Sequence, residues 1–160
     1  MNFKSERTYT IQEATALLEN YCAYQERCHK EVLQKLIDMR MIPDARDHII
    51  SKLINENYLN ETRFSKLFVR SKFNQKKWGN RRLISELKLR NISKYNIDIA
   101  LKEISKEDYI ITFGELAEKR FDQLSGETNN IKKRKKIIDY LIYRGWEFEM
   151  VYRKMTDFFK

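Results

Sequence analysis

The chain has 160 residues, and its 32 Lys+Arg outnumber its 23 Asp+Glu, which gives a formal net charge of +9. Apolar residues make up 42% of it, enough to build a core, so a disordered chain is excluded in spite of 34% charged residues. The 4 Gly and 1 Pro are too few for the frequent turns of an all-β protein, and no clean alternation of apolar and polar residues supports a mixed α/β protein. We therefore expect long helices joined by short links.

Three helices are expected between residues 10 and 59. Thr10 has the position of an N-cap, and Glu13, three residues on, completes a capping box. A second helix is expected from about His29 to Arg40, and Pro43 stops the chain and starts a third. The apolar spacing predicts that the residues facing the core are Ile11, Ala14, Leu18 and Tyr21, then Leu33, Leu36 and Ile37, then Ile49, Ile50, Leu53 and Ile54.

The same order of helices recurs between residues 60 and 105. Asn60 has the position of an N-cap, the Gly79-Asn80 pair breaks the chain, and Ser93 caps a short third helix. The residues expected to face the core are Phe64, Leu67, Phe68, Leu83, Ile84, Leu87, Ile97, Ala100, Leu101 and Ile104.

A third round of helices is expected from about Ser105 onward. Its first helix ends near Leu124, the Ser125-Gly126 link follows, and a second helix ends in residues 140–145. The residues expected to face the core are Phe113, Leu116, Ala117 and Phe121 in the first helix and Met150, Val151, Met155 and Phe158 in the last.

The three rounds form a weak repeat with a period near 50 residues. Each second helix ends in an apolar residue that is followed by an apolar anchor beyond a turn, as in Ile37 and Ile42, Leu87 and Ile92, and Leu141 and Trp146. Such a period, with three helices per unit, is typical of helical repeat arrays. We therefore predict an all-α fold of three tandem three-helix repeats at 10–59, 60–105 and 106–160, preceded by an N-terminal tail at 1–9.

The positive charge is concentrated in the middle repeat. Residues 60–105 hold 12 Lys+Arg against 4 Asp+Glu, a net charge of +8, whereas residues 1–59 hold 8 against 9 and residues 106–160 hold 12 against 10. A polyanion or an acidic groove is therefore the expected partner, and the contact should centre on the middle of the molecule.

Two rows of polar and basic residues are expected on neighbouring helices of the middle repeat. They consist of Arg63, Lys66, Arg70 and Lys77 on one helix and of Arg81, Ser85 and Lys88 on the next. If the helices pack side by side, the rows merge into one basic surface, and we predict that a partner binds it through Arg63, Lys66, Arg70, Lys72, Lys76, Lys77, Arg81, Arg82 and Lys88. The alternative is a basic face that is only solvated, but cations without local partners repel one another, so a bound anion explains the crowding better.

A second candidate site is the basic run at residues 132–136, on the first turns of a helix. The helix dipole disfavours cations there, whereas a phosphate would be held by the side chains and by the free backbone N–H groups. The binding residues would be Lys132, Lys133, Arg134 and Lys136. A frayed, solvated helix start is the alternative, and the sequence favours neither.

Trp78 and Trp146 each lie at a junction between helices. We expect them to fill the gaps left by turns rather than to hold a ligand. Their neighbours Gly79 and Gly145 are expected to adopt positive φ at these junctions.

No arrangement of residues indicates catalysis, a metal or a cofactor. Cys22 and Cys28 are expected in a single helix, where their spacing places them on different faces, so we expect no disulfide. His29 lies beside Cys28, but the chain has no second pair of ligands, which favours structural cysteines over a metal site. Neither His29 nor His48 has a Ser, Cys or Asp partner in a known motif, and the glycines form no phosphate loop. We therefore expect a protein that is not an enzyme.

The sequence also lacks the marks of export. MNFKSERTYT contains no apolar stretch that could serve as a signal peptide, and no segment approaches 18 apolar residues. We therefore expect a cytoplasmic protein without a membrane segment.

The middle repeat contains YLNETRF, FVRSKF, WGNRRLISEL and LRNI, in that order and spacing. In these motifs it resembles the RecX family of bacterial recombination regulators. The flanking repeats resemble the family in AYQERCHKEVLQKL and IISKLINENYL and in KKRKKIIDYLIYRGWEFEMV, so the resemblance extends over residues 10–158. The chain departs from the family at Cys28, where a serine N-cap is usual, at Asn60-Glu61, where many members have two aspartates, and at Asn80, where many have proline.

The resemblance implies an elongated, curved helical array of the right-handed type that has no enzymatic activity. It implies that the protein, expected as a monomer, lies in the groove of the RecA filament on DNA and inhibits RecA, which modulates DNA repair, recombination and the SOS response. Some affinity for DNA is also implied. The competing hypothesis is a helical DNA-binding module with no protein target. The basic rows hold few Asn or Gln suited to base edges, which argues against sequence-specific binding.

Overall fold

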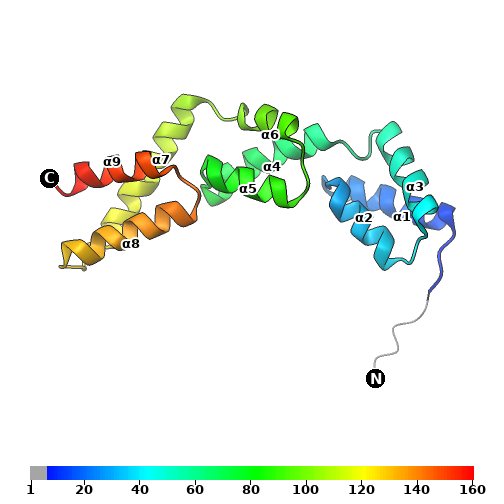
Figure 1. Ribbon diagram of the computed structural model, residues 1–160, viewed down its shortest axis with the longest axis horizontal. Coiled ribbons are helices and arrows are strands. Elements are labelled where there is room, and N and C mark those ends of the chain that lie inside the picture. Colours follow the sequence, from blue (N-terminus) through cyan, green and yellow to red (C-terminus); the bar gives the residue numbers. More distant parts are fainter. Residues whose placement is uncertain (1–6) are drawn as a thin grey trace, which may run out of the picture.

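The computed structural model describes residues 7–160, and nine α-helices lie in this part of the chain (Figure 1). Their bounds are α1 Ile11–Tyr24, α2 His29–Asp38, α3 Pro43–Asn55, α4 Glu61–Lys76, α5 Asn80–Leu89, α6 Lys94–Leu101, α7 Lys106–Gln123, α8 Asn130–Tyr143 and α9 Phe148–Phe158. No strand occurs between residues 7 and 160. The predicted all-α fold of tandem three-helix units is therefore confirmed, while most of the predicted tail at 1–9 lies outside the described residues.

The helices form three successive groups along the long axis of the molecule. We call α1–α3 unit 1, α4–α6 unit 2 and α7–α9 unit 3. Units 1 and 3 lie at opposite ends with unit 2 between them, so the molecule is elongated (Figure 1). The residue limits predicted for the three repeats stay a prediction.

Polar side chains begin several helices. The side-chain oxygens of Thr10, Asn60 and Ser93 each accept a hydrogen bond from the backbone N–H three residues on, at 3.1, 2.9 and 3.2 Å. These three predicted N-caps are confirmed. By contrast, the N-caps of α2 and α5 are Cys28 and Gly79, which form no side-chain cap bond.

Each unit has a hydrophobic core of its own. The fully buried side chains include Leu18, Leu36, Ile49 and Leu53 in unit 1, Leu83 and Leu87 in unit 2, and Ile137, Leu141, Trp146 and Met155 in unit 3. The cores are not confined to their units, because Phe73 of α4 packs in the core of unit 3 and Cys28 of unit 1 packs in that of unit 2.

Five of the residues predicted to face the cores are instead exposed, so the prediction is wrong for them. They are Ile11 at 41% exposure, Leu33 at 38%, Ile37 at 42%, Ile54 at 45% and Leu67 at 39%. A unit of three short helices covers only a narrow stripe of each helix, so a second apolar residue beside the stripe remains at its edge.

The prediction of one helix containing both cysteines is wrong. Cys22 lies in α1, the helix ends at Tyr24, and Cys28 is the N-cap of α2. Both thiols are free and buried, and burial raises the pKa of each. A buried thiol with a raised pKa is poorly reactive, which fits a packing role.

The two junction glycines differ. Gly145 has φ +90°, as predicted, whereas Gly79 has φ −80°, so the predicted positive φ is wrong at that position. Gly79 is required for a different reason, since a Cβ there would lie 2.5 Å from the carbonyl oxygen of Gly145. Between residues 7 and 160, no helix is long and apolar enough to cross a bilayer.

Candidate partner-binding surface

The predicted basic residues of unit 2 do not form one continuous row. α4 ends at Lys76, and Lys77 is its C-cap in the left-handed conformation, with φ +56°. Lys77 therefore leaves the helical stripe in which it was predicted. The remaining cations are divided among several places, and most are engaged by groups of the protein itself.

Arg63 joins unit 2 to unit 1. Its guanidinium donates to the carboxylate of Glu26 and, through Nη2, to the carbonyl oxygen of Asn57 at 2.9 Å. These contacts make Arg63 a structural residue of the link between α3 and α4.

Lys66 and Arg70 share one carboxylate. Both side chains lie 3.6 Å from Glu103, which follows α6. The side chain of Lys66 is 40% exposed and that of Arg70 is 52% exposed, so both stay accessible to a partner beside Glu103.

Lys72 and Arg82 both lie close to the ring of Trp78. The ammonium of Lys72 is 5.4 Å from the centroid of the Trp78 ring, and the guanidinium carbon of Arg82 is 4.3 Å from it. Arg82 also lies 4.7 Å from the Tyr143 ring and donates to the Tyr143 carbonyl oxygen at 3.2 Å. Arg82 therefore holds unit 3 against unit 2 rather than extending freely into solvent.

Arg81 lies 4.0 Å from the centroid of the Phe148 ring, at the start of α9. Arg81, Arg82, Tyr143 and Phe148 line a cavity of about 340 Å³ between α5 and the turn that joins α8 to α9. Cationic and aromatic groups are thus alternately placed along this edge of the unit 2 surface.

Three predicted lysines of this surface are exposed and form no ion pair with another described residue. They are Lys76 and Lys77 at the end of α4 and Lys88 near the end of α5. Because no carboxylate of the described residues pairs with them, they are the predicted cations of this surface that remain most available to an anionic partner.

The basic run on α8 is also divided. Lys133 is buried, with its ammonium 3.6 Å from the centroid of the Phe121 ring, so it faces the core of unit 3. Lys136 pairs with Glu127 at 2.9 Å. Lys132 and Arg134 form no ion pair among residues 7–160, and they are the two of the predicted four that are neither buried nor paired with a carboxylate.

Units 2 and 3 are held together by their turns. Gly79 N donates to the carbonyl oxygen of Arg144 at 2.8 Å, and Arg81 N donates to that of Gly145 at 3.0 Å. In the other direction, Trp146 Nε1 donates to the Lys77 carbonyl oxygen at 3.1 Å. We call residues 76–82 together with 143–146 the unit 2–unit 3 junction.

This junction also caps α5. The first N–H groups of a helix have no partner within it, and Gly79 has no side chain to supply one. The hydroxyl of Tyr109 accepts from Asn80 N at 2.9 Å, and Gly145 accepts from Arg81 N. Unit 3 therefore supplies the groups that an ordinary capping side chain would provide.

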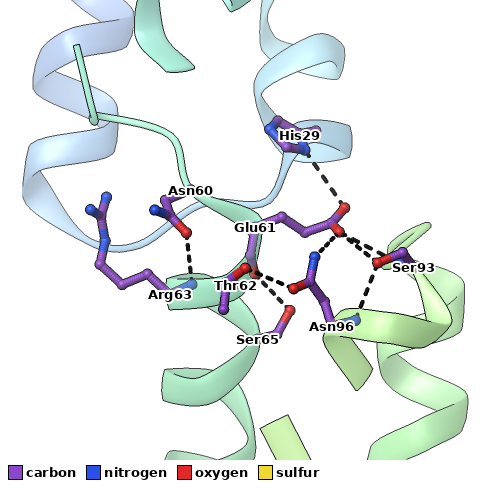
Figure 2. Close-up of polar contacts among 8 residues, drawn as sticks. All are labelled: His29, Asn60, Glu61, Thr62, Arg63, Ser65, Ser93 and Asn96. Carbon is purple, nitrogen blue, oxygen red and sulfur yellow. Dashed lines mark hydrogen bonds and ion pairs between the residues drawn. The ribbon is translucent and has the colours of Figure 1, made fainter. Parts of the chain in front are cut away.

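Units 1 and 2 meet through a polar cluster around Glu61 (Figure 2). One carboxylate oxygen of Glu61 accepts from Asn96 Nδ2 and from Ser93 Oγ at 3.1 Å, and the other lies 3.7 Å from His29 Nδ1. Thr62 Oγ1 donates to Asn96 Oδ1 at 2.7 Å. We call Glu26–Lys30 together with Glu61–Arg63 and Leu89 the unit 1–unit 2 junction.

The hydrogen bonds decide the charge state of this cluster. Burial alone raises the pKa of Glu61, but hydrogen bonds from Asn96 and Ser93, with the nearby His29, outweigh it and hold the pKa below its ordinary value of 4.5. Glu61 is therefore a carboxylate at neutral pH, and its ionised form stabilises the contact between the units.

The sequence did not indicate that Tyr109 would cap α5 or that Lys102 and Lys106 would be exposed beside it. Burial, followed by its contacts with the carboxylate of Glu147, raises the pKa of Tyr109 far above the usual range, so its hydroxyl stays protonated and donates to Glu147. Lys102 lies inside the basic middle third, which was a usable signal, but nothing in the periodicity distinguished it from a solvated lysine.

No group of three or more His, Cys, Asp or Glu in the described residues could hold a metal ion. The surface offers exposed cations and aromatic rings, which suit binding to an anionic macromolecule.

Two family models match the chain. They describe RecX, second three-helix domain, over residues 60–101, and RecX, third three-helix domain, over residues 112–155. These stretches fall in units 2 and 3.

Among curated proteins, the chain is similar to several that are called "Regulatory protein RecX". It is 31% identical over 107 residues to that of Lactobacillus johnsonii, an alignment covering 67% of this chain and 40% of that protein. It is 24% identical over 139 residues to that of Finegoldia magna, an alignment covering 86% of this chain and 68% of that protein. It is 27% identical over 141 residues to that of Listeria monocytogenes, an alignment covering 86% of this chain and 51% of that protein. The chain thus spans between 40% and 68% of the lengths of these three relatives.

Solved structures have the same fold. The crystal structure of RecX from Lactobacillus salivarius matches with a TM-score of 0.78 at 24% identity, covering 92% of this chain and 94% of that one. A second crystal structure, of a regulatory protein RecX, matches with a TM-score of 0.79 at 21% identity, covering 92% and 71%.

Proposed function

Because the two family models together span more than half of it, this chain belongs to the RecX family, and we propose that it is a regulatory protein that binds the RecA filament on DNA and inhibits RecA. In this role it lies in the groove of the filament, contacts more than one protomer and modulates DNA repair, recombination and the SOS response. The protein acts as a monomer in the cytoplasm, by binding and obstruction, without a chemical step.

The observation that carries the proposal is the concentration of positive charge on one unit of an elongated molecule. Unit 2 and its flanking residues 60–105 hold a net charge of +8 out of +9, and unit 2 lies between the other two (Figure 1). An elongated body with a basic centre suits a long groove lined by acidic side chains and phosphates.

Binding to filaments and to bare DNA separates this proposal from its competitor. We would measure co-sedimentation with RecA–DNA filaments, and fluorescence anisotropy with the same DNA alone, from 50 to 300 mM salt. The proposal predicts binding that requires RecA and nucleotide and saturates against RecA protomers. A module acting directly on DNA predicts equal binding without RecA and about one log unit of affinity lost per log unit of salt for each phosphate neutralised.

A pair of lysine variants tests the basic surface itself. Lys76→Gln with Lys88→Gln removes two exposed cations that have no ion pair with another described residue. The matched control, Lys52→Gln with Lys119→Gln, removes two exposed lysines of units 1 and 3 and changes the net charge equally. We expect the first variant to bind filaments with a several-fold weaker affinity. We expect the control variant to bind them with the affinity of the wild-type protein. Equal affinities in both variants would exclude this surface as the contact. Arg82 is unsuitable for such a test, because its loss would disturb the unit 2–unit 3 junction.

A further inference from the structure

A preformed groove of about 450 Å³ lies where unit 2 meets unit 3. Leu101, the last residue of α6, and Ile104, in the link after it, line the groove together with Tyr109 and Ile110 of α7 and Met150 of α9. Four of these residues are half-buried and form its floor, whereas Ile110 is 62% exposed and forms part of its rim. An exposed isoleucine beside an apolar floor is a surface that a partner's apolar side chain can cover.

The floor of the groove is fixed by hydrogen bonds and ring packing. The Tyr109 hydroxyl donates to Glu147 at 2.6 Å and accepts from Asn80 N at 2.9 Å. Its ring lies 4.6 Å from that of Trp146, centroid to centroid. Because these contacts already hold Tyr109 in place, a ligand would find the groove in its binding shape and would not bear the cost of ordering it.

The rim of the groove is positively charged. Lys102 and Lys106 line it, are exposed and form no ion pair with another residue in the described part of the chain. On α7, Lys106 shares a helix face with Tyr109 and Ile110, whereas the neighbouring Glu107 and Asp108 fall on other faces.

Two carboxylates beside residues that line the groove are engaged by other groups of the protein. Glu103, next to Lys102, pairs with Lys66 and Arg70 at 3.6 Å. Glu147 accepts from the Tyr109 hydroxyl. The charges of Lys102 and Lys106 are therefore left to attract groups from outside the molecule.

We propose that this groove binds a short acidic segment of the protein partner, with one apolar side chain against Ile110 and carboxylates paired with Lys102 and Lys106. The inference rests on the proposed function, in which that partner is the RecA filament. An acidic peptide fits better than nucleic acid, because the rest of the floor is aliphatic or Met and the ring of Tyr109 already packs against Trp146 and is not free to stack on a base.

Two variants test the apolar and the charged halves of the site separately. Ile110→Glu places a carboxylate at the apolar rim, and its matched control is Ile131→Glu, since Ile131 is 82% exposed on α8 and does not line the groove. Lys102→Glu with Lys106→Glu reverses the rim charge, and its control is Lys52→Glu with Lys119→Glu. Affinity for RecA–DNA filaments and for the same DNA alone would be measured for each variant, with thermal unfolding to show that each is folded.

We expect both groove variants to bind filaments at least about ten-fold more weakly, as for a central residue of an interface, while both controls bind like the wild-type protein. Wild-type affinity in either groove variant would overturn the inference. An equal loss of affinity for bare DNA would overturn it in favour of nucleic acid, and conversion of a dimer into a monomer by Ile110→Glu would overturn it in favour of a second copy. Absence of filament binding by the wild-type protein would instead refute the proposed function.

Discussion

The same three-helix unit is joined to its neighbours in two different ways. At the unit 2–unit 3 junction, backbone groups of two turns bond to each other and Phe73 of α4 packs in the core of unit 3. At the unit 1–unit 2 junction, the contacts are formed mainly by charged and polar side chains, such as Arg63 with Glu26 and Lys30 Nζ with the Leu89 carbonyl oxygen at 2.6 Å.

The difference has a physical consequence. Backbone hydrogen bonds and apolar burial hold whatever the pH or salt, whereas exposed ion pairs are screened and contribute little. Cavities of about 540 and 330 Å³ border the unit 1–unit 2 contact, with Glu31 and Arg90 lining both. Units 2 and 3 therefore form one continuous body, to which unit 1 is attached by a contact that depends on ionisation.

The largest loss of stability is expected from removing the aromatic ring at the centre of the unit 2–unit 3 junction. Trp146 is fully buried against Phe73, Tyr109 and Phe113. Trp146→Ala should lower the free energy of unfolding by about 3–5 kcal/mol, as for other buried aromatic residues. Urea denaturation would measure this. The comparison is Trp78, the half-buried tryptophan of the same junction, and an equal loss in Trp78→Ala would contradict the central place of Trp146 in it.

A smaller loss of stability is expected when the turn at Gly79 is pushed away from the turn at Gly145. In Gly79→Ala the new Cβ would lie 2.5 Å from the Gly145 carbonyl oxygen, and such overpacking costs about 1–3 kcal/mol. The backbone amides of Asn80 and Arg81 should also lose protection from hydrogen exchange, because their acceptors belong to unit 3.

Gly114→Ala is the control for this substitution. Gly114 lies within α7, and an added Cβ there would have no neighbour within 4 Å. A helical Gly→Ala change in open space should stabilise the protein slightly. Equal behaviour of the two alanine variants would contradict the close approach of the turns.

The unit 1–unit 2 junction should respond to pH. The folded-state pKa of Glu61 lies below its ordinary value of 4.5, so its carboxylate stabilises the folded chain above that pH. As the pH falls through the lowered pKa, Glu61 takes up a proton and this contribution is lost. Glu61→Gln should therefore cost about 1–2 kcal/mol at pH 7 and should remove part of the acid-induced loss of stability.

The control for Glu61→Gln is Glu127→Gln. Hydrogen bonds from Lys136 and from the backbone of Asn129 lower the pKa of Glu127 as well. Glu127, however, pairs with Lys136 at the surface of unit 3 and not at a junction between units. We expect no measurable change in unfolding at pH 7. If both variants lost stability equally in urea titrations, the junction would have no special dependence on Glu61.

The smallest effect is expected from Lys30. Its ammonium donates to the Leu89 carbonyl oxygen in an exposed position, so Lys30→Gln should change the free energy of unfolding by no more than about 0.5 kcal/mol. Arg144 makes the matching bond across the other junction, to the Lys76 carbonyl oxygen at 2.7 Å. A loss in Arg144→Gln no larger than that in Lys30→Gln would contradict the comparison.

Much of the fold could be predicted from the sequence because it depends on local rules. Helix periodicity and the caps Thr10, Asn60 and Ser93 are set within a few residues, and so is the positive φ of Gly145. The choice between neighbouring apolar residues, such as Val32 over Leu33, depends on where other helices pack. No local pattern contains that information.

The candidate surface was harder to predict for the same reason. The sequence shows cations at Arg63, Arg82 and Lys133, but their roles depend on partners that are 37, 61 and 12 positions away along the chain. Through these partners the two arginines join units and the lysine covers an aromatic ring. The groove at Ile110 is lined by residues of four helices from two units, α5, α6, α7 and α9, so no single stretch of sequence indicates it. Charge counting indicated unit 2 as the candidate surface without showing which of its cations stay unpaired.

The most direct test of the regulatory role is the DNA-stimulated ATP hydrolysis of RecA, titrated with this protein at moderate salt. The account predicts loss of hydrolysis at far fewer than one molecule per RecA protomer, because a protein in the filament groove acts on many protomers. Unchanged hydrolysis at a full molar equivalent, together with tight, salt-sensitive binding to bare DNA, would contradict it.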